Sequence, residues 1–264
     1  MPNIRELSVA SNSKKIIFMM YKIKAKQLAS KFRNENDAVN YLESRSIFLR
    51  EFIATEKEEV LMPKYRDLAR LYYACETIKA KNILEYGCGF SSYIFHSFLN
   101  LTQNEDEKKR NFQIIEVHEN YLKTATDRFE ETRNSLIINP SLAKVFLDKS
   151  RNDGSHFYDA KYSILPDLIY LDGPDPADIN GSCFTNCSQR LPISSDILTI
   201  ESWLLPGTIV FIDGRVANVR YLQKKLTRDW EWGIDIQNDV SVAILKEEPL
   251  GLKSRNDLIQ RGLI

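Results

Sequence analysis

The sequence predicts an α/β fold with a seven-stranded, mainly parallel β-sheet and an N-terminal helical extension. Residues 14–81 contain a single proline, and their apolar residues recur at spacings of three and four, as in helices. From residue 82 onward, short β-rich runs alternate with helical segments, which is typical of βαβ units. The last two β-rich runs are separated by only three residues, so we expect a C-terminal antiparallel hairpin.

The length of 264 residues fits one α/β domain with added segments. We expect a helical segment over 1–61 for cap, substrate or oligomer contacts, a main domain over 62–250 and a tail over 251–264. Residues 62–78 are predicted to form the helix before the first strand, with Pro63 in its first turn.

Seven segments are strand candidates because they are short, apolar and bounded by turn residues. In chain order they are Asn82–Tyr86, Phe112–Val117, Ala143–Leu147, Leu168–Leu171, Thr208–Ile212, Gly233–Gln237 and Ser241–Lys246. The first five are expected to be parallel, and the last two to form the hairpin.

Charge and cysteine content exclude several classes of protein. Lys plus Arg and Asp plus Glu both number 36, so no global charge attracts nucleic acid. The four cysteines form no C-x-x-C pair and suit reduced thiols in the cytoplasm, although a Cys183–Cys187 bridge stays open. The N-terminus lacks the pattern of a secretory signal. Eight of the first 33 residues are basic, and a solvated helix face explains them better than membrane contact.

The first predicted strand runs into a glycine turn, NILEYGCGFSS. Gly87 and Gly89 allow the chain to turn sharply and a ligand to approach the backbone. We expect a helix to start near Ser91, where free amide groups favour an anionic part of a ligand. A purely structural turn is the alternative, but an acid, Glu85, two residues before the first glycine favours a binding site.

The E-x-G-x-G pattern after an apolar strand resembles the first motif of the class I S-adenosylmethionine (SAM)-dependent methyltransferases, a Rossmann-like family. The resemblance spans about residues 62–247 and implies that the turn wraps the methionine part of SAM, with the acid positioning its amino group. Ser91 replaces a third glycine, and the two serines would donate to the methionine carboxylate. The cofactor-binding residues implied by the turn are Glu85, Tyr86, Gly87, Gly89, Ser91 and Ser92.

The second predicted strand also ends in an acid, Glu116. In dinucleotide-binding and methyltransferase folds, a carboxylate at this position accepts hydrogen bonds from the ribose hydroxyls. We assign this role to Glu116, with Val117 beside it, while Glu119 is the competing acid. Either acid could instead begin the next helix. Asp148, after the predicted third strand, is placed like the family residue that contacts adenine, with its neighbours Lys149 and Ser150 as alternatives.

Acids follow the fourth and fifth predicted strands as well, in PDLIYLDGPDP and GTIVFIDGR. Asp172 and Asp213 are therefore expected to face the crevice at the carboxyl edge of the sheet. The resemblance places Asp172 beside the methyl group, as a general base that also contacts SAM, and Asp213 as its catalytic partner. In metal-dependent catechol-type O-methyltransferases such positions hold Mg²⁺, but Gly214 replaces an Asn, so a divalent metal is not favoured.

Arg215 and His156 are the candidate substrate-binding residues, because a guanidinium suits anions and His156 lies in a polar loop. His96 is expected to pack in the core, and His118 lies near the predicted cofactor. The loop over 173–193 is a candidate substrate lid.

The sequence therefore predicts a methyltransferase that acts on a hydroxyl or amine of a small molecule or glycan. Self-association stays open. An NAD(P)-dependent oxidoreductase is the alternative, although Ser92 breaks its G-x-G-x-x-G spacing. A non-catalytic SAM- or nucleotide-binding protein with the same fold is the third reading.

Overall fold

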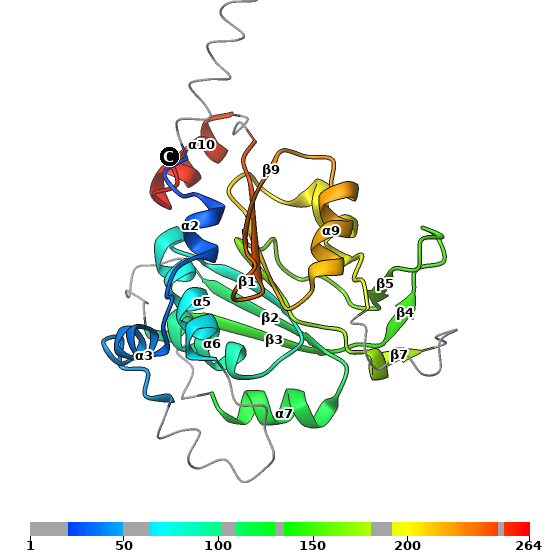
Figure 1. The fold of residues 1–264 in the computed structure, drawn as a ribbon, viewed down its shortest axis with the longest axis horizontal. Coiled ribbons are helices and arrows are strands. Elements are labelled where there is room, and N and C mark those ends of the chain that lie inside the picture. The colour runs from blue at the N-terminus through cyan, green and yellow to red at the C-terminus, as the bar shows by residue number, and fades with distance from the viewer. Residues whose placement is uncertain (1–20, 50–63, 102–108, 130–134, 181–191, 248–250) are drawn as a thin grey trace, which may run out of the picture.

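A seven-stranded sheet lies at the centre of the structure, a computed structural model that describes residues 21–49, 64–101, 109–129, 135–180, 192–247 and 251–264 (Figure 1). The strand order is β3-β2-β1-β6-β8-β10-β9. Six strands of this sheet run in the same direction, and β10 runs in the opposite direction. This is the Rossmann order with an antiparallel pair added at one edge. The predicted fold class, a mainly parallel Rossmann-like sheet with a C-terminal hairpin, is confirmed. The strands are β1 Asn82–Tyr86, β2 Arg110–Glu116, β3 Leu136–Leu142, β6 Leu168–Leu171, β8 Ile209–Asp213, β9 Trp230–Asp235 and β10 Val240–Leu245.

Helices cover both faces of the sheet (Figure 1). Because side chains alternate along each strand, one set of apolar residues packs beneath α2, α3, α5 and α6, and the other set packs beneath α8 and α9. We call the first side the α5 face and the second the α9 face. The helices are α2 Ala25–Ala29, α3 Glu35–Glu43, α5 Tyr65–Ile78, α6 Phe90–Leu101, α7 Glu119–Asp127, α8 Asp196–Ile200, α9 Val216–Lys225 and α10 Gly251–Gln260, with short 3-10 turns η1 Pro176–Asp178 and η2 Glu201–Trp203.

The prediction of the third strand was wrong. The third strand of the sheet is β3, and the predicted segment instead contributes β4 (Val145–Leu147) to a second, three-stranded sheet. The sequence of β3, LIINPSL, contains Pro140 and several polar residues, so it reads as a loop. A proline is tolerated there because β3 lies at the edge of the sheet. The other strands of the small sheet, β5 (His156–Tyr158) and β7 (Ile179–Asn180), were not predicted.

Residues 21–49 and the C-terminal helix α10 share the core of the α5 face. Arg261, which follows α10, bonds to the carbonyl of Gly207 at 3.1 Å and pairs with Asp167 at 3.2 Å beneath the amino ends of the strands. At the far edge, a Cβ on Gly233 would lie 2.2 Å from backbone atoms of α2. Only glycine therefore allows α2 to lie this close to β9.

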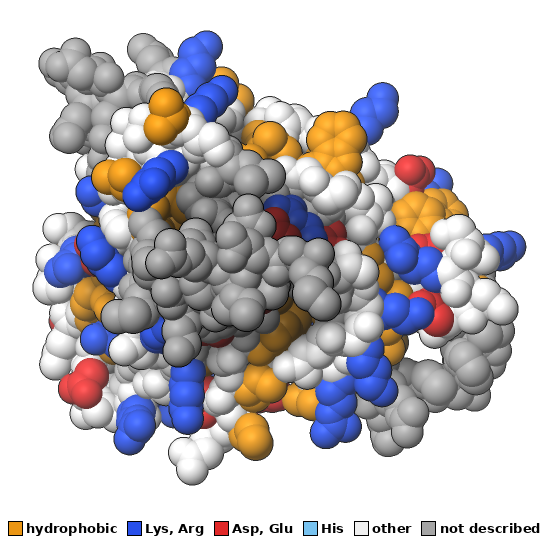
Figure 2. All heavy atoms as spheres, turned by 90° about the horizontal axis from the view of Figure 1, so that it is seen from above, with side chains coloured by type: hydrophobic (Ala, Val, Ile, Leu, Met, Phe, Trp, Pro, Cys, Tyr) orange, Lys and Arg blue, Asp and Glu red, His pale blue; other side chains and the backbone are white. Residues whose placement is uncertain are grey.

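Several sequence predictions concern residues outside the described part, including Cys183, Cys187, most of the proposed lid and the basic residues before 21. Within the described residues, no helix has the length and apolar character needed to cross a bilayer. On the face seen in Figure 2, the described basic and acidic side chains are interspersed with apolar and uncharged surface.

Candidate functional site

Four acids stand at the carboxyl ends of four neighbouring parallel strands, β2, β1, β6 and β8. The residues two positions before them, Ile114, Ile83, Tyr170 and Phe211, all lie in the core of the α5 face. Since side chains alternate along a strand, the acids point to that same face. The structure thus brings together four of the predicted site residues: Glu85, Glu116, Asp172 and Asp213.

The glycine turn lies between β1 and α6. Gly87 has a φ of +81°, and a Cβ there would lie 3.2 Å from the backbone nitrogen of Gly173, so a side chain would be both strained and crowded. Around Gly89 the surroundings are open, because nothing lies within 4 Å of the position of a Cβ. The turn is closed on the side of β6 and open at Gly89, where a ligand could approach the backbone.

Glu85 is fully buried beneath this turn. The hydroxyl groups of Ser91 and Ser92 donate hydrogen bonds to its two carboxyl oxygens at 2.5 and 2.6 Å. Burial raises the pKa of Glu85 to about 8, and the nearby charges of Asp172 and Glu116 add to that rise, while the two serines oppose it. The hydroxyl groups of Ser91 and Ser92 therefore fix the carboxyl group of Glu85. The backbone amides of these two serines, in the first turn of α6, are the groups that could bind a ligand.

Glu116 joins β2 to the glycine turn. One of its oxygens accepts a hydrogen bond from the amide of Cys88 at 2.9 Å, and the other accepts from the amides of Val117 at 2.7 Å and His118 at 2.9 Å. A carboxylate with three amide donors is fixed in position. The oxygen that binds Cys88 keeps capacity for a further donor.

Asp172 and Asp213 have pKa values that favour proton exchange near neutral pH. Asp172 is an exposed residue, yet desolvation of its carboxyl group by the surrounding protein and the charge of Asp213 raise its pKa to about 7, against the opposing charge of Arg215. Burial and the charge of Asp67 raise the pKa of Asp213 to about 6. The hydroxyl of Tyr170 lies 3.5 Å from an oxygen of Asp213, at the outer limit of a hydrogen bond.

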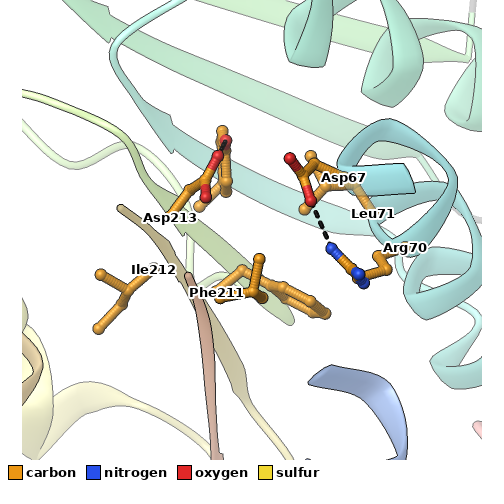
Figure 3. A pocket seen from close by; sticks show the side chains of 8 residues that line it. Asp67, Arg70, Leu71, Phe211, Ile212 and Asp213 are labelled. Carbon is orange, nitrogen blue, oxygen red and sulfur yellow. Dashed lines mark hydrogen bonds and ion pairs between the residues drawn. The ribbon is translucent and has the colours of Figure 1, made fainter. Parts of the chain in front are cut away.

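A pocket lies next to Asp213, between α5 and the ends of β6, β8 and β10 (Figure 3). Its cavity volume is about 10 Å³, which is space for about one water molecule. Figure 3 shows Asp67 of α5 between Asp213 and Arg70, with Phe211 beneath. The lining residues are Asp67, Arg70, Leu71, Tyr170, Phe211, Ile212, Asp213 and Val240.

The charged pair from α5 was not predicted from the sequence. Arg70 is almost fully buried, pairs with Asp67, and donates to the carbonyls of Lys31 at 2.6 Å and Phe32 at 3.1 Å. Burial raises the pKa of Asp67. A three-residue spacing of opposite charges is common on helices, so the sequence carries no signal that this pair lines a pocket.

Three predicted site residues do not join the four acids. Tyr86 points into the α9 face, where its hydroxyl lies 3.0 Å from that of Tyr162. His156 begins β5 of the small sheet, and Asp148 directly follows β4 of that sheet. Burial alone would raise the pKa of Asp148, but hydrogen bonds from Ser150 and Ser195 and the charge of Arg151 lower it. The roles assigned to these three residues stay predictions.

Arg215 and the histidines have contacts of their own. Arg215 is buried and donates to the backbone carbonyls of Pro174, at 2.9 Å, and Asp172. Its guanidinium thus faces the chain that follows β6, and its predicted contact with substrate stays untested. His118 pairs with Asp178 at 2.6 Å. His96 stacks on Phe129 at 4.4 Å, and burial lowers its pKa to about 4.

No three His, Cys, Asp or Glu side chains in the described ranges are placed to hold a metal ion.

Comparisons with known proteins relate the chain to solved methyltransferases. No protein-family model and no curated protein matches the sequence. A methyltransferase of Podospora anserina bound to S-adenosylhomocysteine (SAH) is 12% identical, with 94% of this chain and 98% of that chain covered and a TM-score of 0.44. An O-methyltransferase of tomaymycin synthesis from Streptomyces achromogenes, in complex with SAM, is 16% identical, with coverages of 84% and 95% and a TM-score of 0.42.

An O-methyltransferase from Bacillus cereus in complex with SAH is 15% identical, with 87% of this chain and 99% of that chain covered and a TM-score of 0.42. At these identities and TM-scores, the function of this chain has to be argued from its own residues.

Proposed function

We propose that this protein is a SAM-dependent methyltransferase that acts on a hydroxyl or amine of a small-molecule or glycan acceptor. The observation that carries the proposal is the convergence of four acids around an open glycine turn at the carboxyl edge of a Rossmann-like sheet. This edge is where open α/β sheets bind their ligands.

The residues around the turn fit SAM. Open space at Gly89 leaves room for the methionine part, and the backbone amides of Ser91 and Ser92 in the first turn of α6 suit its carboxylate. A cationic amino group near Glu85 would stabilise the charged form of this buried acid. The oxygen of Glu116 that accepts from the Cys88 amide can also accept a ribose hydroxyl.

SAM supplies a methyl group that its sulfonium already makes electrophilic. Asp172 follows the strand next to β1, and its backbone amide bonds to the carbonyl of Tyr86, at the end of β1, at 3.0 Å. A carboxyl group with a pKa near 7 can take a proton from the acceptor hydroxyl or amine at neutral pH. Asp213 lies one strand further, and we assign the acceptor to the side of the sheet edge that holds Asp172 and Asp213.

Calorimetric titration with SAH and, separately, with NAD tests the proposal. We expect SAH to bind and NAD not to bind. Gly87→Ala should weaken SAH binding at least about tenfold, because the Cβ crowds Gly173 and forces the turn to shift away from the ligand. Gly154→Ala is the matched control, since Gly154 has a similar φ of +75° but open surroundings.

Binding of NAD without SAH would instead favour the oxidoreductase alternative. Equal SAH affinities of the Gly87→Ala and Gly154→Ala proteins would show that the glycine turn is not part of the SAH-binding site.

A further inference from the structure

The chain that follows β6 crosses the ends of two other strands. It leaves β6 at Asp172, whose amide bonds to the carbonyl of Tyr86 at the end of β1 at 3.0 Å. It ends as β7, where Ile179 pairs with Val145 of the small sheet beyond β3. Because β1 and β2 lie between β6 and β3 in the sheet, residues 172–180 pass the carboxyl ends of both strands. We call residues 172–180 the crossing segment.

Arg215 fixes the start of the crossing segment. Its guanidinium donates to the carbonyls of Asp172 and Pro174 and lies 3.6 Å from the carboxyl of Asp175. The side chain of Arg215 is only 2% exposed, so its bonds to the two carbonyls are shielded from water, whereas the side chain of Asp175 is 70% exposed.

His118 fixes the other end. Its Nε2 lies 2.6 Å from the carboxyl of Asp178, whose side chain is 8% exposed, while that of His118 is 48% exposed. Asp178 also accepts a hydrogen bond from the amide of Asp175 at 2.8 Å, which shapes the short helix η1. On the other side of the pair, the amide of His118 donates to Glu116. The pair therefore connects the crossing segment directly to the residue assigned to the ribose.

We propose that His118 is a positioning residue, which holds the crossing segment through Asp178 as a wall of the cofactor crevice and controls how fast the cofactor leaves. This inference rests on the proposed function, because the ribose end of SAM is placed by Glu116. The buried Arg215 keeps one end of the segment fixed, so the half-exposed pair with His118 is the contact that opens first.

The rate of SAH dissociation from the full-length protein tests this inference. His118→Gln and Asp178→Asn should each speed dissociation about 3- to 10-fold, the range expected for the loss of one charge-assisted hydrogen bond. The matched control is Asp127→Asn, which removes an exposed pair with Lys123 on helix α7. The control should change the rate less than about twofold. Equal rates for His118→Gln and Asp127→Asn would overturn the inference.

Hydrogen exchange without ligand separates this inference from the proposed function. In the His118→Gln protein, amides of the crossing segment should exchange about 3- to 10-fold faster than in the wild type, while those of β1 and β6 stay unchanged. Unchanged exchange in the crossing segment would overturn the inference even if SAH binds. If the crossing segment exchanges faster in the His118→Gln protein but the wild type does not bind SAH, His118 fixes the crossing segment and the proposed function is contradicted.

Discussion

The acids at the two ends of the row of strands differ in the number of hydrogen bonds that their carboxyl groups accept. On the cofactor side, Glu85 accepts two serine hydroxyls and Glu116 accepts three backbone amides. On the acceptor side, the hydrogen bond described for Asp213 is a single long contact from Tyr170. A carboxylate with many donors is a fixed structural group, whereas one with few donors keeps lone pairs for a proton. Under the proposed function, Glu85 and Glu116 would hold the cofactor, and Asp172 and Asp213 would exchange protons with the acceptor.

The largest effect that follows from this contrast concerns catalysis. Asp172→Asn should lower methyl transfer about 10²- to 10⁴-fold, because the amide cannot accept the proton of the acceptor, while SAH affinity stays within about threefold. Transfer of labelled methyl from SAM to a panel of hydroxyl and amine compounds measures the rate. Asp127→Asn, at an exposed acid on α7, is the control. Full activity in the Asp172→Asn protein would contradict the role of this residue as the base.

On the cofactor side, removal of an acid should cost stability. Glu85→Ala leaves the buried hydroxyls of Ser91 and Ser92 without their acceptor and creates a cavity, so the free energy of unfolding should fall by about 2–4 kcal/mol. Glu85→Gln keeps the volume and one acceptor oxygen and should cost less. Urea unfolding measures both. An equal loss in the two variants would show that the serines do not depend on this acceptor.

The pH dependence of stability should reveal the same buried acid. The pKa of Glu85 is about 8 in the folded protein and about 4.5 when unfolded, so the folded state binds the proton more tightly. Stability should therefore fall as the pH rises from about 4.5 to 8 and then level off. Glu85→Gln should flatten this part of the curve in unfolding measurements without ligand. A wild-type curve that rises over this window, or one that the variant leaves unchanged, would contradict the assignment.

Much of the fold could be predicted from the sequence because local pattern and tertiary structure agree there. The β1 segment has an apolar centre with an acid near its end, the β6 segment is an apolar run followed by an acid, and both were placed at their observed bounds. The edge strand β3, with Pro140, and the two-residue β7 carry no such pattern. Their pairing depends on partners that are distant in the sequence.

The candidate site shows the same division. The four acids were predicted because each lies near the end of a predicted strand or directly after it, and parallel strands bring their carboxyl ends together. Asp67 and Arg70 lie on a helix before the first strand, and their position beside Asp213 arises only from the packing of α5 on the sheet. The sequence also gives no sign that Asp178 of the crossing segment pairs with His118.

The smallest expected effect concerns the boundary between the two halves. Arg215 lowers the pKa of Asp172, so Arg215→Gln should shift the pH midpoint of methyl transfer upward, by less than about one unit. The pH–rate profiles of the wild type and the variant measure this shift. A downward shift would mean that the charge of Arg215 does not act on the base.

The most direct test of the central claim is a crystal structure of the protein with SAH bound. The account predicts the methionine part against the turn at Gly89, ribose hydroxyls within hydrogen-bonding distance of Glu116, and the sulfur facing Asp172. SAH bound against the small sheet or on the α9 face, away from these acids, would contradict it.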